Sequence, residues 1–303
     1  GREGTAVQMG ASLADTVARA LRLGPTLRRV ALVAGVAGGF GAVFGTPAAG
    51  AVFALEFAVR GSLRARAAAP AIVAAVVGDA VAGALGVGHT PYPAAPAVAL
   101  SAALLARWLV FAAALAAVAV AFIELTHALK RLAERLAPRL PLRMAATGVA
   151  VVALWLVAGT DDYLGLGVPT IVRAFDDPTL PAAAFAWKLV FTSVTLAGGF
   201  MGGEVTPLFF VGATLGNTLG QALSIPLPLA AGVGFAALFG AAAHAPIALS
   251  VLAVELLGAA VLPHVLLVAV LASRWTGHRS IYSAQRSHAH AHGLERLAPD
   301  VAP

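Results

Sequence analysis

Charged residues and cysteine are scarce in this chain. Only 11% of its 303 residues are Asp, Glu, Lys or Arg, none is cysteine, and 60% are hydrophobic. An ordinary soluble domain carries roughly 25% charged residues, so this composition predicts a polytopic membrane protein. The lack of cysteine excludes disulfides, thiolate chemistry and cysteine-ligated metals.

Several functional patterns are also missing from the sequence. The apolar runs are long and do not alternate with polar residues, which favours helices over a β-barrel. No basic stripe with interleaved aromatics accompanies the net charge of +6, so we expect no nucleic-acid partner. No phosphate loop, Ser/His/Asp order or zinc-type spacing is found. We therefore expect no enzyme, cofactor or metal, and a solvated tail at His288, His290 and His292.

The hexapeptide Gly202–Pro207 interrupts the apolar sequence that begins at Leu189 and continues beyond Leu208. Glycine permits backbone geometries that other residues resist, and proline is favoured in the first turn of a helix. Glu204 and Thr206 would then stand at a helix start, where free N–H groups and the helix dipole favour an anion. Because such a start is tolerated at membrane depth only beside a polar cavity, we predict half of an ion site here.

Three pairs of short segments match one another at similar spacings along the chain. They are Gly10–Thr16 with Gly212–Thr218, Phe40–Gly45 with Phe235–Gly240, and Phe53–Glu56 with Leu252–Glu255, at offsets of 202, 195 and 199 residues. The loops of the first copy are basic, whereas the corresponding loops of the second copy carry no basic residue. Because basic loops prefer the cytoplasm, the two copies are predicted to face opposite ways, as an inverted repeat.

The predicted fold is all-α, polytopic and built partly from broken helices. Several apolar segments are shorter than the ~20 residues of a full crossing, whereas Ala97 to about Leu136 is predicted as one long helix with a basic end. We divide one transmembrane domain into residues 1–96, the remainder of the first repeat, 97–276, the second repeat, and 277–303, the last helix and cytoplasmic tail. The chain begins within a motif and without methionine, so we expect an N-terminally truncated fragment.

Glu3 and Glu204 each lie within two residues of a glycine-rich break. Inversion of the repeat would bring both helix starts to the membrane midplane from opposite sides. Their positive ends favour an anion, and a carboxylate beside them can imitate the anion until it is protonated and leaves. This arrangement predicts the coupled movement of anions and protons.

Five features together resemble the CLC chloride channel and transporter superfamily over essentially the whole chain. They are Gly1-Arg2-Glu3-Gly4, the break at Gly202–Pro207, the helices ending at Glu56 and Glu255, and the pair Ile281-Tyr282. Thr5 stands where the family usually has proline, and Val205 where it has phenylalanine. Both departures are similar to the fluoride/proton antiporter branch of the family.

This resemblance implies a role for each residue of the predicted site. Glu3 would be the gating glutamate, and Tyr282 the inner-gate tyrosine. The remaining ion-binding positions would be Gly4, Thr5, Ala6, Glu204, Val205 and Thr206. The resemblance also implies a homodimer in a bacterial-type inner or plasma membrane, with a halide (fluoride or chloride), protons and the lipid bilayer as partners.

Other functions stay open at the level of sequence. Phe57 stands where the family's chloride/proton exchangers have a second acid, so the inner proton route is expected to differ. The motif that separates fluoride from chloride preference would precede Gly1. A chloride channel or chloride/proton exchanger is therefore the first alternative, and a membrane-embedded enzyme or a non-transporting scaffold is the second.

Structural roles compete with functional ones at several positions. Glu3 could be a surface residue, Thr206 a helix cap, and Tyr282 an interfacial aromatic. The polar residues expected to be structural are Glu56 and Glu255 at headgroup level or a dimer surface, Lys188, Asp79 and Glu124 at the interface, and Asn217 between helices.

Overall fold

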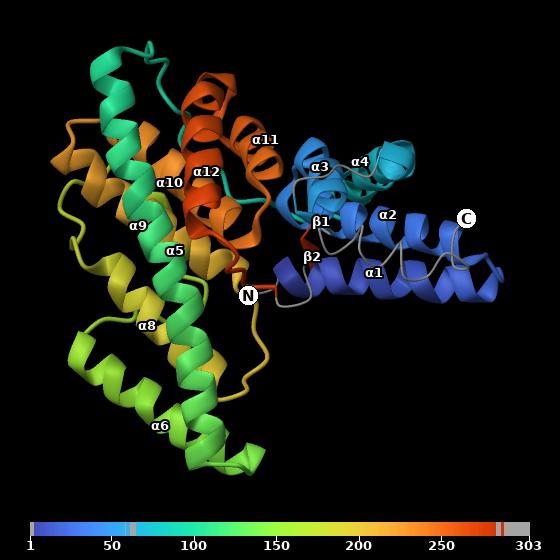
Figure 1. Cartoon of the computed structure of the whole chain (residues 1–303), viewed down its shortest axis with the longest axis horizontal. Coiled ribbons are helices and arrows are strands. Elements are labelled where there is room, and N and C mark those ends of the chain that lie inside the picture. Colours follow the sequence, from blue (N-terminus) through green and yellow to red (C-terminus); the bar gives the residue numbers. More distant parts are fainter. Residues whose placement is uncertain (1–2, 58, 61–64, 283–285, 288–303) are drawn as a thin grey trace.

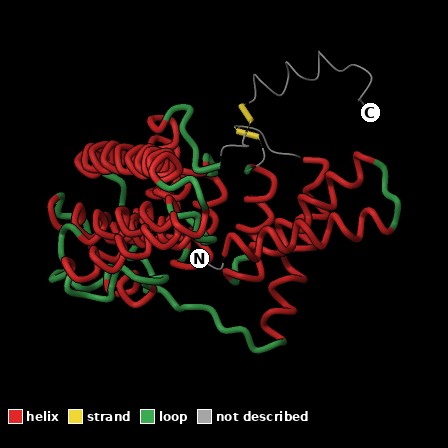
Figure 2. Tube along the Cα trace, turned by 90° about the horizontal axis from the view of Figure 1, so that it is seen from below, coloured by secondary structure: helices red, strands yellow, loops and turns green. Residues whose placement is uncertain are grey.

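The computed structural model describes residues 3–57, 59–60, 65–282 and 286–287. Helices make up almost all of its regular structure (Figures 1 and 2), which confirms the predicted all-α class. The α-helices are α1 (Glu3–Ala20), α2 (Pro25–Phe44), α3 (Pro47–Glu56), α4 (Ala68–Ala84), α5 (Ala102–Leu136), α6 (Leu140–Ala158), α7 (Val168–Arg173), α8 (Ala184–Ala197), α9 (Val205–Ala222), α10 (Leu227–Ala243), α11 (Pro246–Leu257) and α12 (Leu262–Thr276).

The minor elements are short and do not change the fold class. Two 3₁₀ turns, η1 (Ala65–Ala67) and η2 (Ala259–Val261), precede α4 and α12. The strands β1 (Val59–Arg60) and β2 (Arg286–Ser287) pair in parallel over two residues each. The predicted last helix and the three tail histidines fall mostly on residues 283–285 and 288–303, which lie outside the described residues; Gly277–Tyr282 is not helical.

Helix lengths agree with a polytopic protein that contains partial helices. Of the helices described, four are long and apolar enough to cross a membrane: Pro25–Phe44, Ala102–Leu136, Leu140–Ala158 and Ala259–Thr276. Five further apolar helices have only 10–17 residues, as expected for broken segments. The 35 residues of α5 extend to about 52 Å at 1.5 Å per residue, so this helix is longer than the hydrocarbon core is thick.

The breaks between α2 and α3 and between α10 and α11 have the same construction. Each first helix ends on a left-handed residue, Gly45 with φ 67° and His244 with φ 52°. Each second helix begins with a proline, Pro47 or Pro246, whose missing N–H costs nothing at that position. Glycine is suited to the left-handed conformation, whereas His244 adopts it with a side chain.

These breaks fix the register of the repeat where α2 and α3 correspond to α10 and α11. Gly45 and His244, Pro47 and Pro246, and Glu56 and Glu255 are all 199 residues apart. In this register Phe40 corresponds to Phe239, so its predicted match with Phe235 is wrong by four residues. The error has a physical cause, because residues four apart lie on the same face of a helix and follow similar patterns.

Two carboxylates join α3 to α11 in a reciprocal manner. Glu56, at the end of α3, accepts hydrogen bonds from the N–H groups of Ile247 (3.2 Å) and Ala248 (2.7 Å) at the start of α11. Glu255, near the end of α11, accepts them from Ala48 (2.9 Å) and Ala49 (2.7 Å) at the start of α3. The two helices are therefore antiparallel, as inverted copies require.

The expected placement of Glu56 at a headgroup or dimer surface is therefore wrong, whereas Glu255 is exposed and its expected placement stays a prediction. Both residues are helix caps within the chain, and Glu56 is only 5% exposed. Carboxylates that accept N–H groups at a helix start also benefit from the helix dipole.

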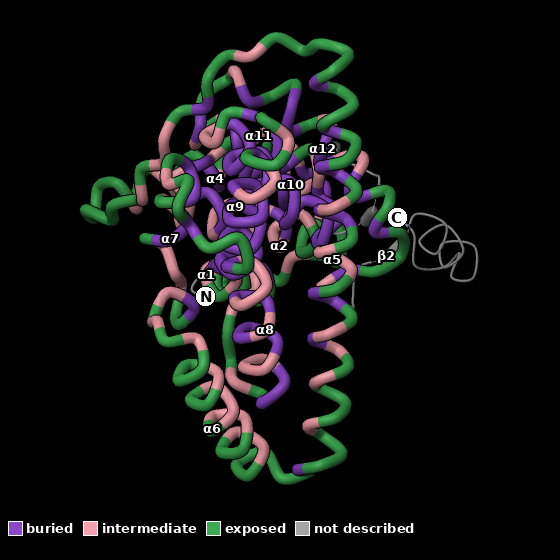
Figure 3. Tube along the Cα trace, turned by 90° about the vertical axis from the view of Figure 1, so that its left-hand side faces the viewer, coloured by how far each residue is buried: buried purple, intermediate pink, exposed green. Residues whose placement is uncertain are grey.

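Close glycine contacts bring the helices of each copy together. A β-carbon at Gly10 in α1 would lie 2.2 Å from the carbonyl oxygen of Gly35 in α2. A β-carbon at Gly212 in α9 would lie 2.2 Å from the carbonyl oxygen of Gly234 in α10. Small residues of this kind allow membrane helices to approach backbone to backbone. The buried centre of the molecule lies around α9 and α10 (Figure 3).

Candidate functional site

The first turn of α1 lies against the chain segment that leads into α9. A β-carbon at Gly4 would lie 3.9 Å from the α-carbon of Gly203, although 199 residues separate the two glycines. The two predicted helix starts therefore meet, which is the arrangement expected of a site shared by both repeats. Each start directs the free N–H groups of its first turn outward from the helix.

The start of α9 is not capped by a side chain. Glu204 occupies the cap position, and among the described residues no side chain bonds to the first N–H groups of the helix. Val205 and Thr206 are buried there. Uncapped N–H groups at the positive end of a helix form a place where an anion is favoured.

Thr206 has a hydroxyl group without a partner. Its side chain is 3% exposed, and its Oγ1 forms no hydrogen bond with any residue that the structure describes. The alternative role of Thr206 as a helix cap is therefore wrong. Because a buried polar group without a hydrogen bond is costly, an acceptor such as an anion would relieve this hydroxyl.

The two glutamates of the site differ in position and burial. Glu3 is the first residue of α1 and is 6% exposed, so it is not the surface residue considered as an alternative. Glu204 precedes the first residue of α9 and is half-buried. Successive positions on a helix point about 100° apart, so the two carboxylates do not occupy equivalent places in the two copies.

The remaining residues of the first helix start differ in exposure. Gly4 and Ala6 are partly buried, whereas Thr5 is exposed. The structure therefore brings the backbone of the first turn to the site without burying the Thr5 side chain. Ala6 also contacts α2, because a β-carbon at Gly39 would lie 2.5 Å from the Ala6 carbonyl oxygen.

Tyr282 and Phe57 both pack against the main hydrophobic core. The Tyr282 ring meets that of Phe57 edge to face, with centroids 4.7 Å apart and an interplanar angle of 88°. Phe57 thus contacts the predicted gate residue directly.

The segment that carries Tyr282 is fixed by contacts that the sequence did not suggest. His244 Nε2 lies 2.8 Å from the carbonyl oxygen of Arg279, and the Ile281 N–H donates to the carbonyl oxygen of Ala242 at 3.1 Å. Arg279 also forms a 2.7 Å ion pair with Glu124 of α5. These partners are far apart in sequence, and no local pattern marks them.

Lys188 is buried within the protein, so the expectation that its charge lies exposed at the membrane interface is wrong. It is 1% exposed, and its Nζ donates to the carbonyl oxygens of Tyr163 (3.0 Å) and Gly165 (2.7 Å). The same atom lies 5.0 Å from the centre of the Phe210 ring, one helical turn beyond Thr206 in α9. The positive charge of Lys188, held against the Phe210 ring of α9, favours an anion near this helix.

Asn217 is a further polar residue with a structural role. Asn217 packs between helices as predicted, because its amide donates to the carbonyl oxygens of Ala174 and Asp177 at 2.9 Å each. Within the described part of the chain, no group of three histidines, cysteines or carboxylates is placed to hold a metal ion.

Known proteins are similar to this chain in sequence. The family model described as voltage gated chloride channel matches residues 1–278. A "Chloride/fluoride channel protein" of Pseudomonas syringae pv. tomato is 43% identical over 299 residues, covering 94% of this chain and 64% of that protein. The "Voltage-gated ClC-type chloride channel ClcB" of Salmonella typhi is 32% identical over 166 residues, covering 50% of this chain and 39% of that protein. The chain thus spans less than two thirds of the length of these relatives.

Solved structures agree with these matches. A CLC-type fluoride/proton antiporter superimposes with a TM-score of 0.91 at 32% identity, covering 95% of this chain and 72% of the other. A slow cyanobacterial Cl⁻/H⁺ antiporter gives a TM-score of 0.75 at 17% identity, covering 99% of this chain and 72% of the other, and supports the fold alone. With a family match over nearly its whole length, the chain belongs to the voltage-gated chloride channel (CLC) family, as its sequence predicted.

Proposed function

We propose that this protein is a halide transporter that exchanges fluoride for protons, with Glu3 as the gating carboxylate. The observation that carries the proposal is the meeting of the two helix starts at Gly4 and Gly203, with Glu3 buried in the first turn of α1. Fluoride is favoured because of the chloride/fluoride name of the Pseudomonas relative and the antiporter title of the structural neighbour. Thr5 and Val205 support the same branch.

The proposed ion site consists of backbone N–H groups with one hydroxyl. The first turn of α1 supplies amides from Gly4, Thr5 and Ala6, and the start of α9 supplies those of Val205 and Thr206. The unpartnered Thr206 hydroxyl adds a further donor. The Glu3 carboxylate competes with the halide for these donors, and protonation removes its charge so that it leaves the site. Alternate occupation by the halide and by Glu3 couples the two flows.

The inner proton route is proposed to pass through Glu204. Phe57 offers no titratable group, and its ring lies against Tyr282. Glu204 is a half-buried acid at the start of α9, and we propose that it takes the place of the acid that the family's chloride/proton exchangers carry after Glu56. We further propose a homodimer within a bacterial inner or plasma membrane, by likeness to the family.

The decisive experiment measures fluoride, chloride and proton fluxes in proteoliposomes. Wild-type protein should move fluoride faster than chloride and should drive protons in the opposite direction. Glu3→Gln should still conduct fluoride but lose proton movement, because the amide cannot be titrated. Asp176→Asn, which changes an exposed acid in the loop before α8, is the matched control and should keep the wild-type coupling.

Three results would contradict the proposal in different ways. Unchanged coupling in Glu3→Gln would exclude Glu3 as the gating group. Faster chloride than fluoride transport by the wild type would favour a chloride channel or exchanger. A correctly folded protein with no halide flux would favour a membrane enzyme or a scaffold.

A further inference from the structure

A cavity of about 240 Å³ lies between α5, α6 and α8 near the α5–α6 turn. Its walls are almost wholly apolar, with Leu132 and Leu136 from α5, Ala146 and Ala150 from α6, and Val194 from α8. Arg143 and Thr147 are its polar members, and the Thr147 hydroxyl already donates to the carbonyl oxygen of Arg143 at 2.8 Å. The cavity therefore combines an apolar interior with one guanidinium.

The Arg143 guanidinium is incompletely satisfied. Its side chain is only 16% exposed, and its Nη1 lies 3.8 Å from the Glu134 carboxylate, too far for a hydrogen bond. Its Nε is buried and has no hydrogen-bond partner among the residues that the structure describes. A buried donor of this kind is costly, and a phosphate oxygen is the acceptor that arginine binds best.

The surroundings of the cavity fit a membrane surface. Arg131, Arg135 and Arg139 are exposed around the α5–α6 turn, and so are the apolar side chains of Leu132, Leu136, Leu140 and Leu142. Mixed basic and apolar side chains at a helix end are typical of the headgroup region. The positive charge predicts the cytoplasmic face, where anionic lipids concentrate, and basic pockets between helices bind their headgroups.

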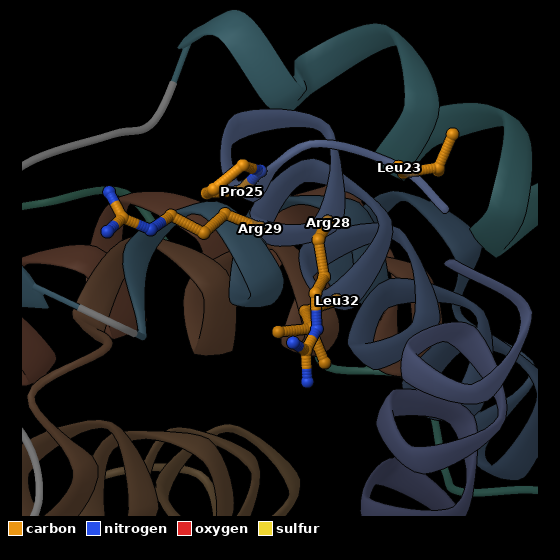
Figure 4. Close-up of a pocket in the computed structure, with 5 residues that line it drawn as sticks. All are labelled: Leu23, Pro25, Arg28, Arg29 and Leu32. Carbon is orange, nitrogen blue, oxygen red and sulfur yellow. The ribbon is translucent and has the colours of Figure 1, made fainter. Parts of the chain in front are cut away.

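We propose that this cavity binds an anionic phospholipid, with an acyl chain between α5, α6 and α8 and its phosphate on Arg143. A second basic cavity, of about 320 Å³, lies at the turn between α1 and α2 (Figure 4). Its arginines, Arg28 and Arg29, are not comparable with Arg143. Arg28 already donates to Asp15 through Nη2 at 3.0 Å, and Arg29 has no buried unpartnered donor.

The residues that would bind the lipid phosphate pack against the segment that leads to the proposed ion site. A β-carbon at Gly199, which has φ 84°, would lie 3.3 Å from Arg143 Nη2, and one at Gly198 would lie 2.0 Å from the Thr147 hydroxyl. Arg143 and Thr147 thus pack against the link from α8 to α9, a few residues before Glu204. A phosphate on Arg143 holds the guanidinium over this link.

Native mass spectrometry of the purified, delipidated protein tests the proposal without measuring transport. Palmitoyl-oleoyl phosphatidylglycerol, the phosphatidylcholine with the same chains, and inorganic phosphate are added separately. We expect phosphatidylglycerol to bind at least about fivefold more tightly than phosphatidylcholine, and phosphate alone to leave no adduct. Arg143→Gln should lose about fivefold in affinity for phosphatidylglycerol, whereas Arg143→Lys should retain most of it.

Two further variants distinguish this site from general attraction to basic residues. Ala146→Phe fills the cavity while keeping every charge, and it should also weaken phosphatidylglycerol binding. Arg274→Gln removes an exposed arginine from the last turn of α12, outside the residues that line the cavity, and should bind as wild type does. Equal binding of both lipids by wild type, or wild-type binding by both Arg143→Gln and Ala146→Phe, would overturn the proposal.

Discussion

The helices α1 and α9 hold equivalent places in the two copies but have different surroundings. Both have 18 residues and both cross their neighbour at a glycine. Nearly all of α9 is buried beneath α5, α7, α8 and α10, whereas α1 buries only Glu3 and Ala18 and exposes Met9, Leu13 and Val17. The burial of a membrane helix is thus decided by its neighbours, and the proposed ion site uses only the first turn of each helix.

The crossing glycines give the largest expected difference between the two copies. Gly212→Ala places a methyl group 2.2 Å from the Gly234 carbonyl oxygen inside the packed centre. We expect it to lower the free energy of unfolding by about 3 kcal/mol or more. Gly10→Ala meets the same obstacle at Gly35, but α1 can shift towards its exposed side, so the loss should be about 1 kcal/mol. Thermal unfolding in detergent measures both.

Gly83→Ala in α4 is the control for these two variants. Nothing lies within 4 Å of the added methyl group, so the melting temperature should stay at the wild-type value. Equal losses of stability in Gly10→Ala and Gly212→Ala would mean that the surroundings of a helix do not determine how well its closest contact accepts an added methyl group.

The reciprocal caps should differ in strength because their burial differs. Glu56→Gln removes the charge of a buried carboxylate that accepts hydrogen bonds from two N–H groups at the start of α11. We expect it to lower the free energy of unfolding by about 2 kcal/mol. Glu255→Gln removes the matching cap at an exposed position, where water can replace it, and should cost clearly less. Chemical denaturation of the two variants, compared with the double variant, provides the measurement; a greater loss from Glu255→Gln would refute the comparison.

The two helix starts should contribute unequally to halide binding. Thr206→Val removes the unpartnered buried hydroxyl and should weaken fluoride binding about tenfold, the value of one hydrogen bond to an ion. Thr5→Val changes an exposed side chain in the other start and should leave affinity unchanged. Isothermal titration with fluoride measures both constants. If Thr5→Val had the larger effect, the donor assignment of the proposed site would be incorrect.

The smallest effect concerns the loop between α7 and α8. Hydrogen bonds from the Thr179 hydroxyl, Arg173 and the Thr179 N–H lower the pKa of Asp177 to about 2. A lowered pKa means that the carboxylate stabilises the fold above its ordinary value near 3.8, and that this stability is lost as pH falls towards 2. Asp177→Asn should therefore lower the melting temperature slightly and equally from pH 8 to 5. A difference that grew on acidification would contradict this assignment.

Local features of the sequence were sufficient to predict where the helices of the candidate site begin. Glycine and proline act on the backbone where they stand, so the break at Gly202–Pro207 was predicted correctly, and the inverted repeat correctly predicted that the two helix starts meet, as Gly4 and Gly203 do. The burial of the site residues and their exact partners were not predictable in this way. Thr206 and Thr5 are both threonines at helix starts, yet only one is buried.

Interactions between distant segments account for the errors. The partners of Glu56 lie 191 and 192 residues away, and those of Lys188 lie 25 and 23 residues away in an irregular loop. No periodicity within a single helix indicates such a pairing. The slip between Phe235 and Phe239 has a different origin, because a four-residue shift preserves a helical pattern and only the helix ends reveal it.

The pairing of α3 with α11 has a consequence during biosynthesis. Ala48 leaves the ribosome 207 residues before Glu255, its hydrogen-bond partner. At translation rates of about 5–20 residues per second, the start of α3 waits on the order of 10 to 40 s for that carboxylate. During this interval the nascent α3 depends on water, lipid headgroups or the insertion machinery to satisfy its amides, so the early half of the protein cannot mature before the late half is made.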